Sequence, residues 1–269
     1  MIKLNDKRID IGKFPDGTIL MKKFVEKDFR AGREGTITWF FENNEELIAL
    51  IYLTRHLQTH GIENIHLNMP YIPNARQDRV KSDEDVFTLK YFAEMINSLN
   101  FKSVTVLDPH SSVSEALINN IRIISPKENI EKVISKIKTE KQPLLMFYPD
   151  EGAMKRYSGM ISLPYTFGMK KRDWATGQIQ GLDVAGMTDL IKDSDILIVD
   201  DISSRGGTFY FSAKTLKELG AKKIYLYVSH CENTILEGEV LKSGLIERVF
   251  TTNSIFTAKN DMIEVIDYE

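Results

Sequence analysis

The sequence has little cysteine and no long apolar segment. It contains a single cysteine, Cys231, which cannot form an internal disulfide, and it has no Cys/His spacing that suits a structural zinc ion. No apolar run approaches the roughly 18 residues of a membrane span, and the opening residues are too polar for a signal peptide. These absences argue against a disulfide-stapled secreted domain and a transmembrane protein. They predict a soluble, cytoplasmic protein with no membrane partner.

An excess of charge of one sign is also lacking. The 35 Lys and Arg residues nearly balance the 38 Asp and Glu residues, for a formal charge of −3. Such a chain has no overall positive field to attract nucleic acid, so no nucleic-acid partner is expected. A polyanionic ligand would have to be bound by local cations or by a metal ion. The 42% hydrophobic content is that of an ordinary globular protein.

From about residue 44 onward, apolar segments alternate between helical and extended periodicity. Helices are predicted over 45–60, 88–99, 115–120, 129–138 and 209–219. Strands are predicted over 64–70, 103–107, 122–125, 144–148, 160–165, 195–199, 223–229 and 248–252. This alternation indicates an α/β fold with parallel sheets. The polar stretch 139–143 divides it into an N-terminal α/β domain, residues 1–140, and a C-terminal α/β domain, residues 141–269.

Local signals set some of the boundaries. Asn43 or Asn44 can cap the helix that starts at 45, and Gly61 can end it. A Gly-containing loop is expected after the strand at 144–148. The polar segment 169–180 has no clear periodicity and is expected to be a mobile loop.

Four segments lie at expected carboxyl ends of strands, where open α/β sheets bind ligands. The first, residues 200–208, joins two carboxylates to a small-residue loop with two glycines and to the start of a helix. Backbone N–H groups of such a loop suit a phosphate monoester. Asp200 and Asp201 suit sugar hydroxyls or a metal ion. The alternative is a strand that ends in an Asp pair before an ordinary glycine turn.

The second and third segments follow two other strands. Arg76 and Gln77 lie in the loop 73–79, where forked donors suit phosphates or a base. The alternative is a solvated loop with a local Arg–Asp pair. His110 follows Asp108 at the end of the strand 103–107. It is either a partner of magnesium or phosphate or a satisfied structural histidine.

The fourth set combines an acidic strand end with basic residues. Asp150 follows the strand 144–148 and can orient metal-bound water, and Lys155 and Arg156 come shortly after it. Lys170 and Arg172 belong to a cationic loop that can close on a transition state and neutralise phosphate charge. The alternative for this basic loop is an exposed turn.

In order and spacing, these segments together resemble those of the ribose-phosphate diphosphokinases, the phosphoribosyl pyrophosphate synthetases. The matching stretches are 74–79, 108–111, 148–153, 170–172 and 199–208. Residues 14–18 resemble the element that contacts adenine from a neighbouring subunit in that family. The resemblance implies two phosphoribosyltransferase-like, Rossmann-like domains. It also implies transfer of the β,γ-diphosphate of Mg-ATP to the anomeric hydroxyl of ribose 5-phosphate, giving phosphoribosyl pyrophosphate and AMP.

The resemblance assigns roles to individual residues of this chain. Lys170 and Arg172 would be catalytic. ATP would be bound by Phe14, Asp16, Arg76, Gln77 and His110. The metal, Mg²⁺, would be held by His110 and Asp150. The ribose phosphate would be bound by Asp200, Asp201, Ser204, Arg205, Gly206, Gly207 and Thr208. Active sites shared between subunits imply a homo-oligomer, a dimer or larger.

The chain also departs from the family pattern. Arg205 stands where the phosphate loop usually has a small hydroxyl residue, and Thr18 stands where the adenine element commonly has Glu. The section before residue 14 is shorter than in the family by about one βα unit, which would suit a phage-type member. Arg205 favours an acceptor whose phosphate is itself substituted, such as ADP-ribose in NAD salvage. The alternative is that Arg205 faces solvent or pairs with Asp201.

Two other functions stay open. A phosphoribosyltransferase would use the 199–208 site, but it would not need the ATP-side residues and the Lys170 loop together. A non-catalytic regulatory relative would be expected to lose the Lys170 loop, which this chain keeps. The sequence therefore favours an ATP-dependent transferase of nucleotide biosynthesis.

Overall fold

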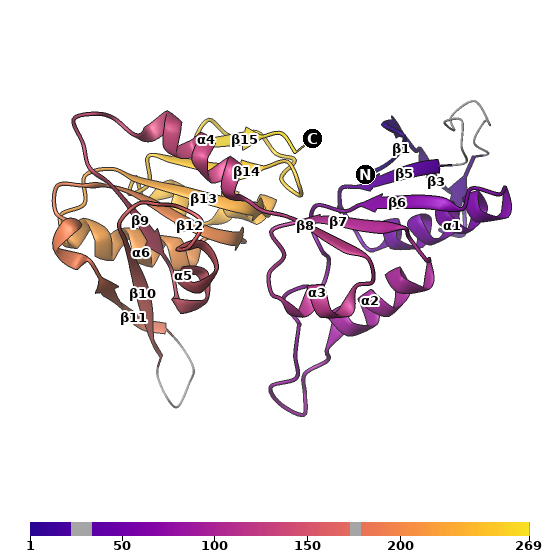
Figure 1. The fold of residues 1–269 in the computed structure, drawn as a ribbon, viewed down its shortest axis with the longest axis horizontal. Helices are drawn as coiled ribbons and strands as arrows, with labels where there is room; N and C mark the ends of the chain where they lie inside the picture. The colour runs from indigo at the N-terminus through magenta and orange to yellow at the C-terminus, as the bar shows by residue number, and fades with distance from the viewer. Residues whose placement is uncertain (23–33, 173–178, 269) are drawn as a thin grey trace. The chain divides into compact units, whose positions relative to one another are not determined.

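The chain divides into two compact units, Met1–Ser125 and Pro126–Glu269 (Figure 1). The structure is a computed structural model that describes residues 1–22, 34–172 and 179–268. The division comes before the polar stretch 139–143 that the sequence suggested as a boundary. Helix α4 (Lys127–Ile137) explains the difference, because its Ile130 and Val133 belong to an apolar cluster of the second unit. Among the described residues, no helix is both long enough and apolar enough to cross a bilayer.

Unit 1 is built on a six-stranded sheet in the order β2-β1-β5-β6-β7-β8. The strands are β1 (Ile2–Leu4), β2 (Lys7–Arg8), β5 (Glu34–Trp39), β6 (Asn64–Asn68), β7 (Ser103–Leu107) and β8 (Ile121–Ile124). Strands β5 to β8 are parallel, as expected, and β1 and β2 add an antiparallel edge. A separate hairpin pairs β3 (Ile11–Lys13) with β4 (Ile19–Met21). The sequence did not indicate the strands before residue 44.

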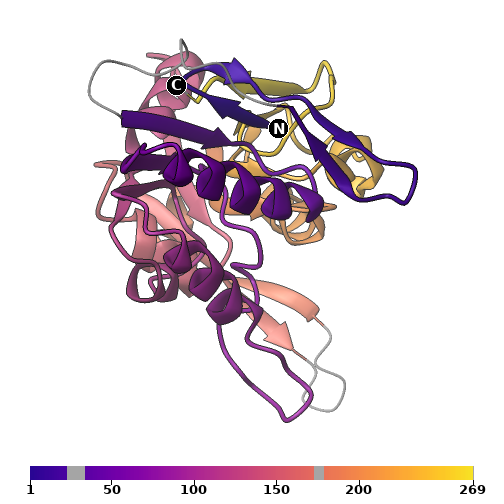
Figure 2. The ribbon, with the colours of Figure 1, turned by 90° about the vertical axis from the view of Figure 1, so that its right-hand side faces the viewer.

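The helices of unit 1 include α1 (Glu45–Thr59), α2 (Thr88–Ser98) and the short α3 (Val113–Leu117). Helices α1 and α2 cover one face of the sheet (Figure 2). Alternation along β5 decides which face: Ile37 and Trp39 are buried in the core, whereas Thr38 between them is only half-buried. Leu53 of α1 and Phe92 of α2 pack in the same apolar cluster. Unit 1 therefore buries its sheet against these helices.

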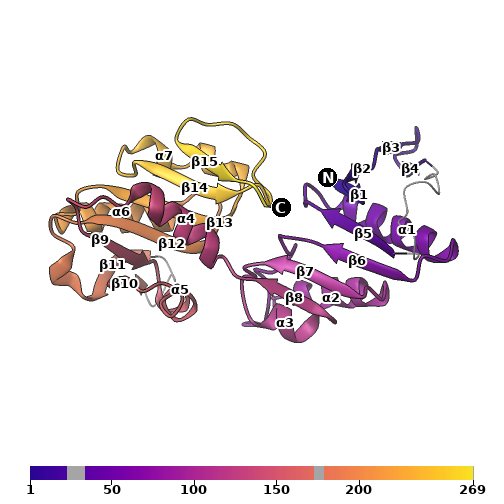
Figure 3. The same cartoon turned by 45° about the horizontal axis from the view of Figure 1, so that its top comes forward.

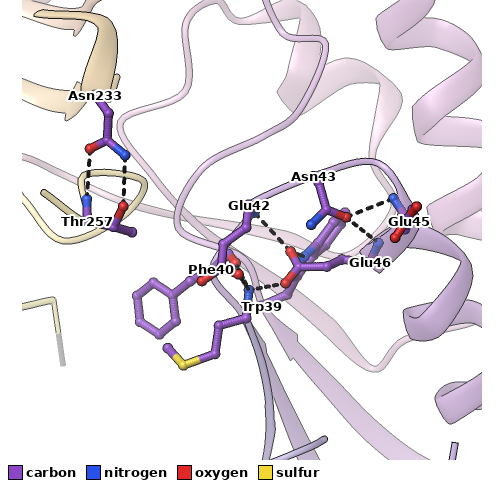
Figure 4. Close-up of polar contacts among 9 residues, drawn as sticks. Trp39, Phe40, Glu42, Asn43, Glu45, Glu46, Asn233 and Thr257 are labelled. Atoms are coloured by element: carbon purple, nitrogen blue, oxygen red, sulfur yellow. Dashed lines mark hydrogen bonds and ion pairs between the residues drawn. The ribbon is translucent and has the colours of Figure 1, made fainter. Parts of the chain in front are cut away.

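The start of α1 is fixed by polar contacts (Figure 4). The side-chain oxygen of Asn43 accepts hydrogen bonds from the backbone N–H groups of Glu45 and Glu46, at 3.0 and 3.2 Å. The buried carboxylate of Glu46 accepts a hydrogen bond of 2.9 Å from the indole of Trp39 and also pairs with the amino group of Met1. Gly61, with φ of 77°, follows the end of the helix. Of the two predicted caps, Asn43 supplies the side-chain bonds, and the predicted glycine stop is confirmed.

Unit 2 is built on a seven-stranded sheet in the order β11-β10-β9-β12-β13-β14-β15 (Figure 3). Its strands are β9 (Leu144–Tyr148), β10 (Tyr165–Arg172), β11 (Ile179–Gly186), β12 (Asp195–Ser203), β13 (Ile224–Cys231), β14 (Arg248–Thr252) and β15 (Ile263–Ile266). All neighbours are parallel except β10 and β11, which form an antiparallel pair. The predicted α/β class with parallel sheets is confirmed, with antiparallel strands at the edges.

The sheet of unit 2 is buried on both faces. Helix α4 and helix α5 (Glu151–Tyr157) contribute to one apolar cluster with Met146 and Leu197. Helix α6 (Gly207–Glu218) contributes to the other, with Phe147 and Ile198. Because both faces are covered, β9 and the stretch Ile196–Val199 of β12 are continuously apolar, which is typical of central parallel strands. The remaining elements are η2 (Thr188–Leu190), η3 (Asn233–Glu237) and α7 (Glu239–Lys242).

Three local expectations for unit 2 were wrong. The loop expected after β9 begins helix α5, because the side chain of Asp150 accepts a hydrogen bond of 3.0 Å from the N–H of Ala153 and caps the helix. The strand expected at 160–165 starts at Tyr165 instead, and the described ends of the segment 169–180 are paired strands rather than a loop. Pairing between β10 and β11 fixes these strands, and the local sequence carries no periodicity that reveals it.

Candidate active site

The strand β12 delivers the acidic end of the candidate acceptor site in unit 2. Residues from Asp195 to Val199 are buried, and the strand ends past Asp200 and Asp201. The loop that follows turns at Gly206, with φ of 74°, and α6 begins at Gly207. The predicted order of apolar strand, carboxylate pair, glycine loop and helix is thus present in the structure.

The two glycines of this loop have different reasons to be glycine. A Cβ on Gly206 would lie 2.5 Å from Cγ1 of Val240, in a left-handed conformation that side chains disfavour. A Cβ on Gly207 would meet no atom within 4 Å. Packing of the protein therefore requires glycine at 206, whereas the space beside Gly207 is open to a ligand.

The carboxylates at the strand ends are electrostatically strained. Burial, the neighbouring Asp201 carboxylate and the more distant Asp150 raise the pKa of Asp200 well above its usual range. Asp201 is buried, and its Oδ1 lies 3.5 Å from Nη1 of Arg156 in α5. The structure thus brings together Asp150, Asp200 and Asp201 with Arg156, which the sequence groups with Asp150 without indicating a role of its own.

Asp150 has a structural contact in addition to its predicted metal role. Its Oδ1 accepts the N–H of Ala153 and so caps α5. Within the described parts of the chain, no group of three or more His, Cys, Asp or Glu side chains is arranged to hold a metal ion. A magnesium ion bound with phosphates needs only one or two protein carboxylates, so Mg²⁺ and its ligands Asp150 and His110 stay predictions.

Arg205 lies at the rim of the phosphate loop. Its Nη2 lies 2.9 Å from Oε2 of Glu237, at the end of η3, and the Arg205 side chain is 73% exposed. Of the two expected alternatives, Arg205 faces solvent, and its ion pair is made with Glu237 instead of Asp201. A Cβ on Gly238 would collide with the backbone carbonyl of Arg205, so η3 and the phosphate loop are in close contact. Glu237 was missed because it is distant in sequence and belongs to no motif.

The candidate ATP loop of unit 1 follows β6. Arg76 and Gln77 are exposed, and the Gln77 side chain accepts a hydrogen bond of 2.8 Å from Thr88 at the start of α2. Arg79 makes two hydrogen bonds of 2.7 Å to the carboxylate of Asp78. These bonds, with smaller contributions that include His110, lower the pKa of Asp78 to about 2. The local Arg–Asp pair therefore involves Arg79.

His110 lies in the neighbouring loop, after β7. Asp108 before it is buried and has φ of 39°, and its N–H donates to the carbonyl of Ile124 at 3.1 Å. Since His110 contributes to the lowered pKa of Asp78, the loops 74–79 and 108–111 lie close together. Two of the predicted ATP-side segments are therefore adjacent within unit 1. The metal role of His110 stays a prediction.

Phe14 and Asp16 lie at the tip of the β3–β4 hairpin. The Phe14 side chain is 49% exposed. Oδ1 of Asp16 accepts hydrogen bonds from the N–H and hydroxyl of Thr18, at 3.0 and 2.7 Å, and these bonds lower the pKa of Asp16. Asp16 thus shapes the turn, and the predicted contact of Phe14 with adenine in a homo-oligomer stays a prediction.

The predicted catalytic residues fall at the edge of what the structure describes. The backbones of Lys170 and Arg172 belong to β10, opposite Leu182 and Ile179 of β11. Their side chains lie outside the described part of the chain. Their catalytic roles therefore stay predictions.

Comparisons with known proteins agree with the resemblance. No family model matches the chain. Ribose-phosphate pyrophosphokinase 2 of Archaeoglobus fulgidus is 30% identical over 255 residues, which cover 90% of this chain and 86% of that protein. Ribose-phosphate pyrophosphokinase of Thermococcus kodakarensis is 29% identical over 258 residues, covering 93% and 86% of the two chains.

A solved structure has the same fold. Phosphoribosylpyrophosphate synthetase from Mycobacterium smegmatis superposes with a TM-score of 0.77 over 97% of this chain and 86% of that one, at 17% sequence identity. The similarity in sequence to the two archaeal enzymes covers so much of the chain that it extends over both units. The chain therefore belongs to the ribose-phosphate pyrophosphokinase family and is a transferase of the diphosphokinase type.

Proposed function

We propose that the protein transfers the β,γ-diphosphate of Mg-ATP to the anomeric hydroxyl of ribose 5-phosphate, forming phosphoribosyl pyrophosphate and AMP. The observation that carries the proposal is the open space beside Gly207, at the start of α6 and in the loop that follows the carboxylates of β12. The curated relatives are named for activity on ribose phosphate, which supports the same acceptor.

The geometry of unit 2 supports the acceptor half of the proposal. The 5-phosphate would sit against the backbone N–H groups of the loop 204–208, where the dipole of α6 favours negative charge. Gly207 leaves room for its oxygens to approach the backbone. Asp200 and Asp201 would accept hydrogen bonds from the ribose hydroxyls. This would fix the sugar so that its anomeric hydroxyl can attack the β-phosphate of ATP.

The donor half is assigned to unit 1. Arg76 and Gln77 are exposed in the loop after β6 and offer forked donors to ATP. His110 lies in the adjacent loop, close to Asp78. Phosphoryl transfer depends mainly on positioning and neutralisation of charge, so the residues required are cations and a fixed acceptor. Lys170 and Arg172 would stabilise the transferring diphosphate.

A magnesium ion is the proposed cofactor, and when it binds with phosphates it would need only one or two carboxylates of the protein. The raised pKa of Asp200 reflects carboxylates that are close together and partly buried, an arrangement that a divalent cation stabilises. The proposed metal ligands are Asp150 in unit 2 and His110 in unit 1. When bound, Mg²⁺ would supply positive charge that neutralises the diphosphate of ATP.

The proposal is tested by the products formed from ATP and ribose 5-phosphate, identified by mass. Release of AMP with formation of phosphoribosyl pyrophosphate, in the absence of any nucleobase, is the expected result. Consumption of phosphoribosyl pyrophosphate only when a nucleobase is present would instead identify a phosphoribosyltransferase. No turnover of any acceptor would favour a non-catalytic relative.

A second candidate acceptor is ADP-ribose, and the exposed Arg205 favours it. Its ion pair with Glu237 is on the surface, where such pairs contribute about 0–1 kcal/mol, so a phosphate can replace Glu237 as the partner. The second phosphate of ADP-ribose would extend from the loop toward this side chain, giving a product for NAD salvage. The same assay with ADP-ribose decides between the two acceptors, and activity with ribose 5-phosphate alone would eliminate this candidate.

A further inference from the structure

The acceptor site of unit 2 contains a partly buried cation that the proposed reaction does not use. Nη1 of Arg156, in the last turn of α5, lies 3.5 Å from Oδ1 of Asp201. The Asp201 side chain is 6% exposed and that of Arg156 is 26% exposed. The pair is therefore shielded from water far more than a surface ion pair, and its loss would have a larger effect.

The guanidinium of Arg156 is itself held in place by aromatic rings. It lies over the ring of Tyr157, 5.5 Å from the centroid, and Nη1 donates to the Tyr157 hydroxyl at 3.4 Å. Tyr157 is fully buried and stacks on Tyr148, the last residue of β9, with 6.3 Å between ring centroids. The cation is thus anchored in the core rather than free to follow Asp201.

Helix α5 connects this cation to the other carboxylates. Asp150 caps the start of the helix and Arg156 lies near its end. Strand β9, which leads into Asp150, pairs with β12, which leads into Asp200 and Asp201. Helix α5 therefore sets the spacing between the Asp150 carboxylate, at its start, and the Asp201 carboxylate, which pairs with its last turn.

We propose that Arg156 is a positioning residue of the acceptor site, which orients the Asp200–Asp201 carboxylates to receive the hydroxyls of the ribose. The inference rests on the proposed function, because it assumes that these carboxylates bind the acceptor. Without the guanidinium, Asp201 would be a buried charge without this partner, close to Asp200. The two carboxylates would separate or rotate, and the ribose hydroxyls would lose their acceptors.

The test compares Arg156→Gln and Arg156→Lys with the wild-type enzyme. Binding of ribose 5-phosphate alone is measured by calorimetry, and KM for each substrate and kcat are measured with Mg-ATP. Lys155→Gln is the matched control, because Lys155 is the preceding residue of the same helix but is exposed and pairs with Glu151. Thermal unfolding of each variant reports any general loss of structure.

We expect Arg156→Gln to weaken ribose 5-phosphate binding by about tenfold or more and to raise the acceptor KM in parallel, with KM for ATP changed by less than about twofold. Arg156→Lys should recover part of the affinity, and Lys155→Gln should bind as the wild type does. In a double-mutant cycle of Arg156→Gln with Asp201→Asn, the two losses of affinity for ribose 5-phosphate should be less than additive.

Other outcomes distinguish failure of the positioning role from failure of the proposed function. If the wild type binds and uses ribose 5-phosphate but Arg156→Gln and Arg156→Lys bind it equally well, the positioning role is wrong even if both variants melt earlier. If Arg156→Gln does not fold, Arg156→Lys provides the test. The positioning role would be overturned if Arg156→Lys binds ribose 5-phosphate as the wild type does and its effect on affinity simply adds to that of Asp201→Asn. If the wild type neither binds nor uses ribose 5-phosphate, the proposed function itself fails.

Discussion

The two adjacent glycines of the phosphate loop allow stability and function to be separated. Gly206→Ala should destabilise unit 2 by about 2–5 kcal/mol. About 1–2 kcal/mol comes from a side chain at φ of 74°, and about 1–3 kcal/mol comes from the approach to Val240. Gly207→Ala should leave the free energy of unfolding unchanged or slightly raised, because its Cβ meets no atom and alanine favours the helix.

The functional effect of Gly207→Ala should be the reverse of its effect on stability. A methyl group in the open space would displace a phosphate from one or two backbone N–H groups. Each charge-assisted hydrogen bond lost costs about 1.5–3 kcal/mol. The acceptor KM should therefore rise by about tenfold or more, with KM for ATP nearly unchanged.

Denaturant unfolding and steady-state kinetics with both substrates test this pair of variants. Gly206→Ala combined with Val240→Ala should regain part of the lost stability, because the Cγ1 contact is removed. A Gly207→Ala enzyme that is stable and has the wild-type acceptor KM would refute the assignment of this loop to the phosphate. A Gly206→Ala enzyme as stable as the wild type would refute the account of the close contact.

Three further outcomes are expected. The lowered pKa of Asp78 contributes stability above about pH 4 that is lost as the pH falls toward 2. In Asp78→Asn, the free energy of unfolding measured with urea should therefore fall less steeply over this acid range than in the wild type. An unchanged dependence on pH would contradict this. Lys170→Ala should reduce kcat by about 100-fold or more with little change in melting, and near-normal turnover would remove Lys170 from the mechanism. Burial and Glu232 raise the pKa of Cys231 to about 12. Thiol reagents at pH 8 should therefore modify the native protein far more slowly than the urea-unfolded chain. Equal rates would show that the thiol is accessible.

Features set by neighbouring residues could be predicted from the sequence. Helix α1 is an example, because its cap at Asn43 and its stop at Gly61 are local signals. The contiguous segment from the end of β12 to the start of α6 is another. Both carry their signal in a few consecutive residues, although β12 also pairs with β9 and β13.

Features set by distant partners could not be predicted. Strands β1 and β2 have three and two residues and owe their structure to pairing with each other and with β5. The same limit applies to the site. The sequence indicates Arg156 only beside Asp150 and gives no sign of Glu237, and only the fold brings the two residues to Asp201 and Arg205.

The continuity of the segment 200–208 has an evolutionary consequence. All the proposed acceptor contacts are encoded by one short, uninterrupted stretch, whereas the proposed donor contacts of unit 1 come from separate loops. A few neighbouring codon changes can therefore alter which ribosyl compound is accepted, while the phosphate-donor chemistry is inherited unchanged. Exposed positions such as Arg205 can vary in this way without disturbing either apolar cluster of unit 2.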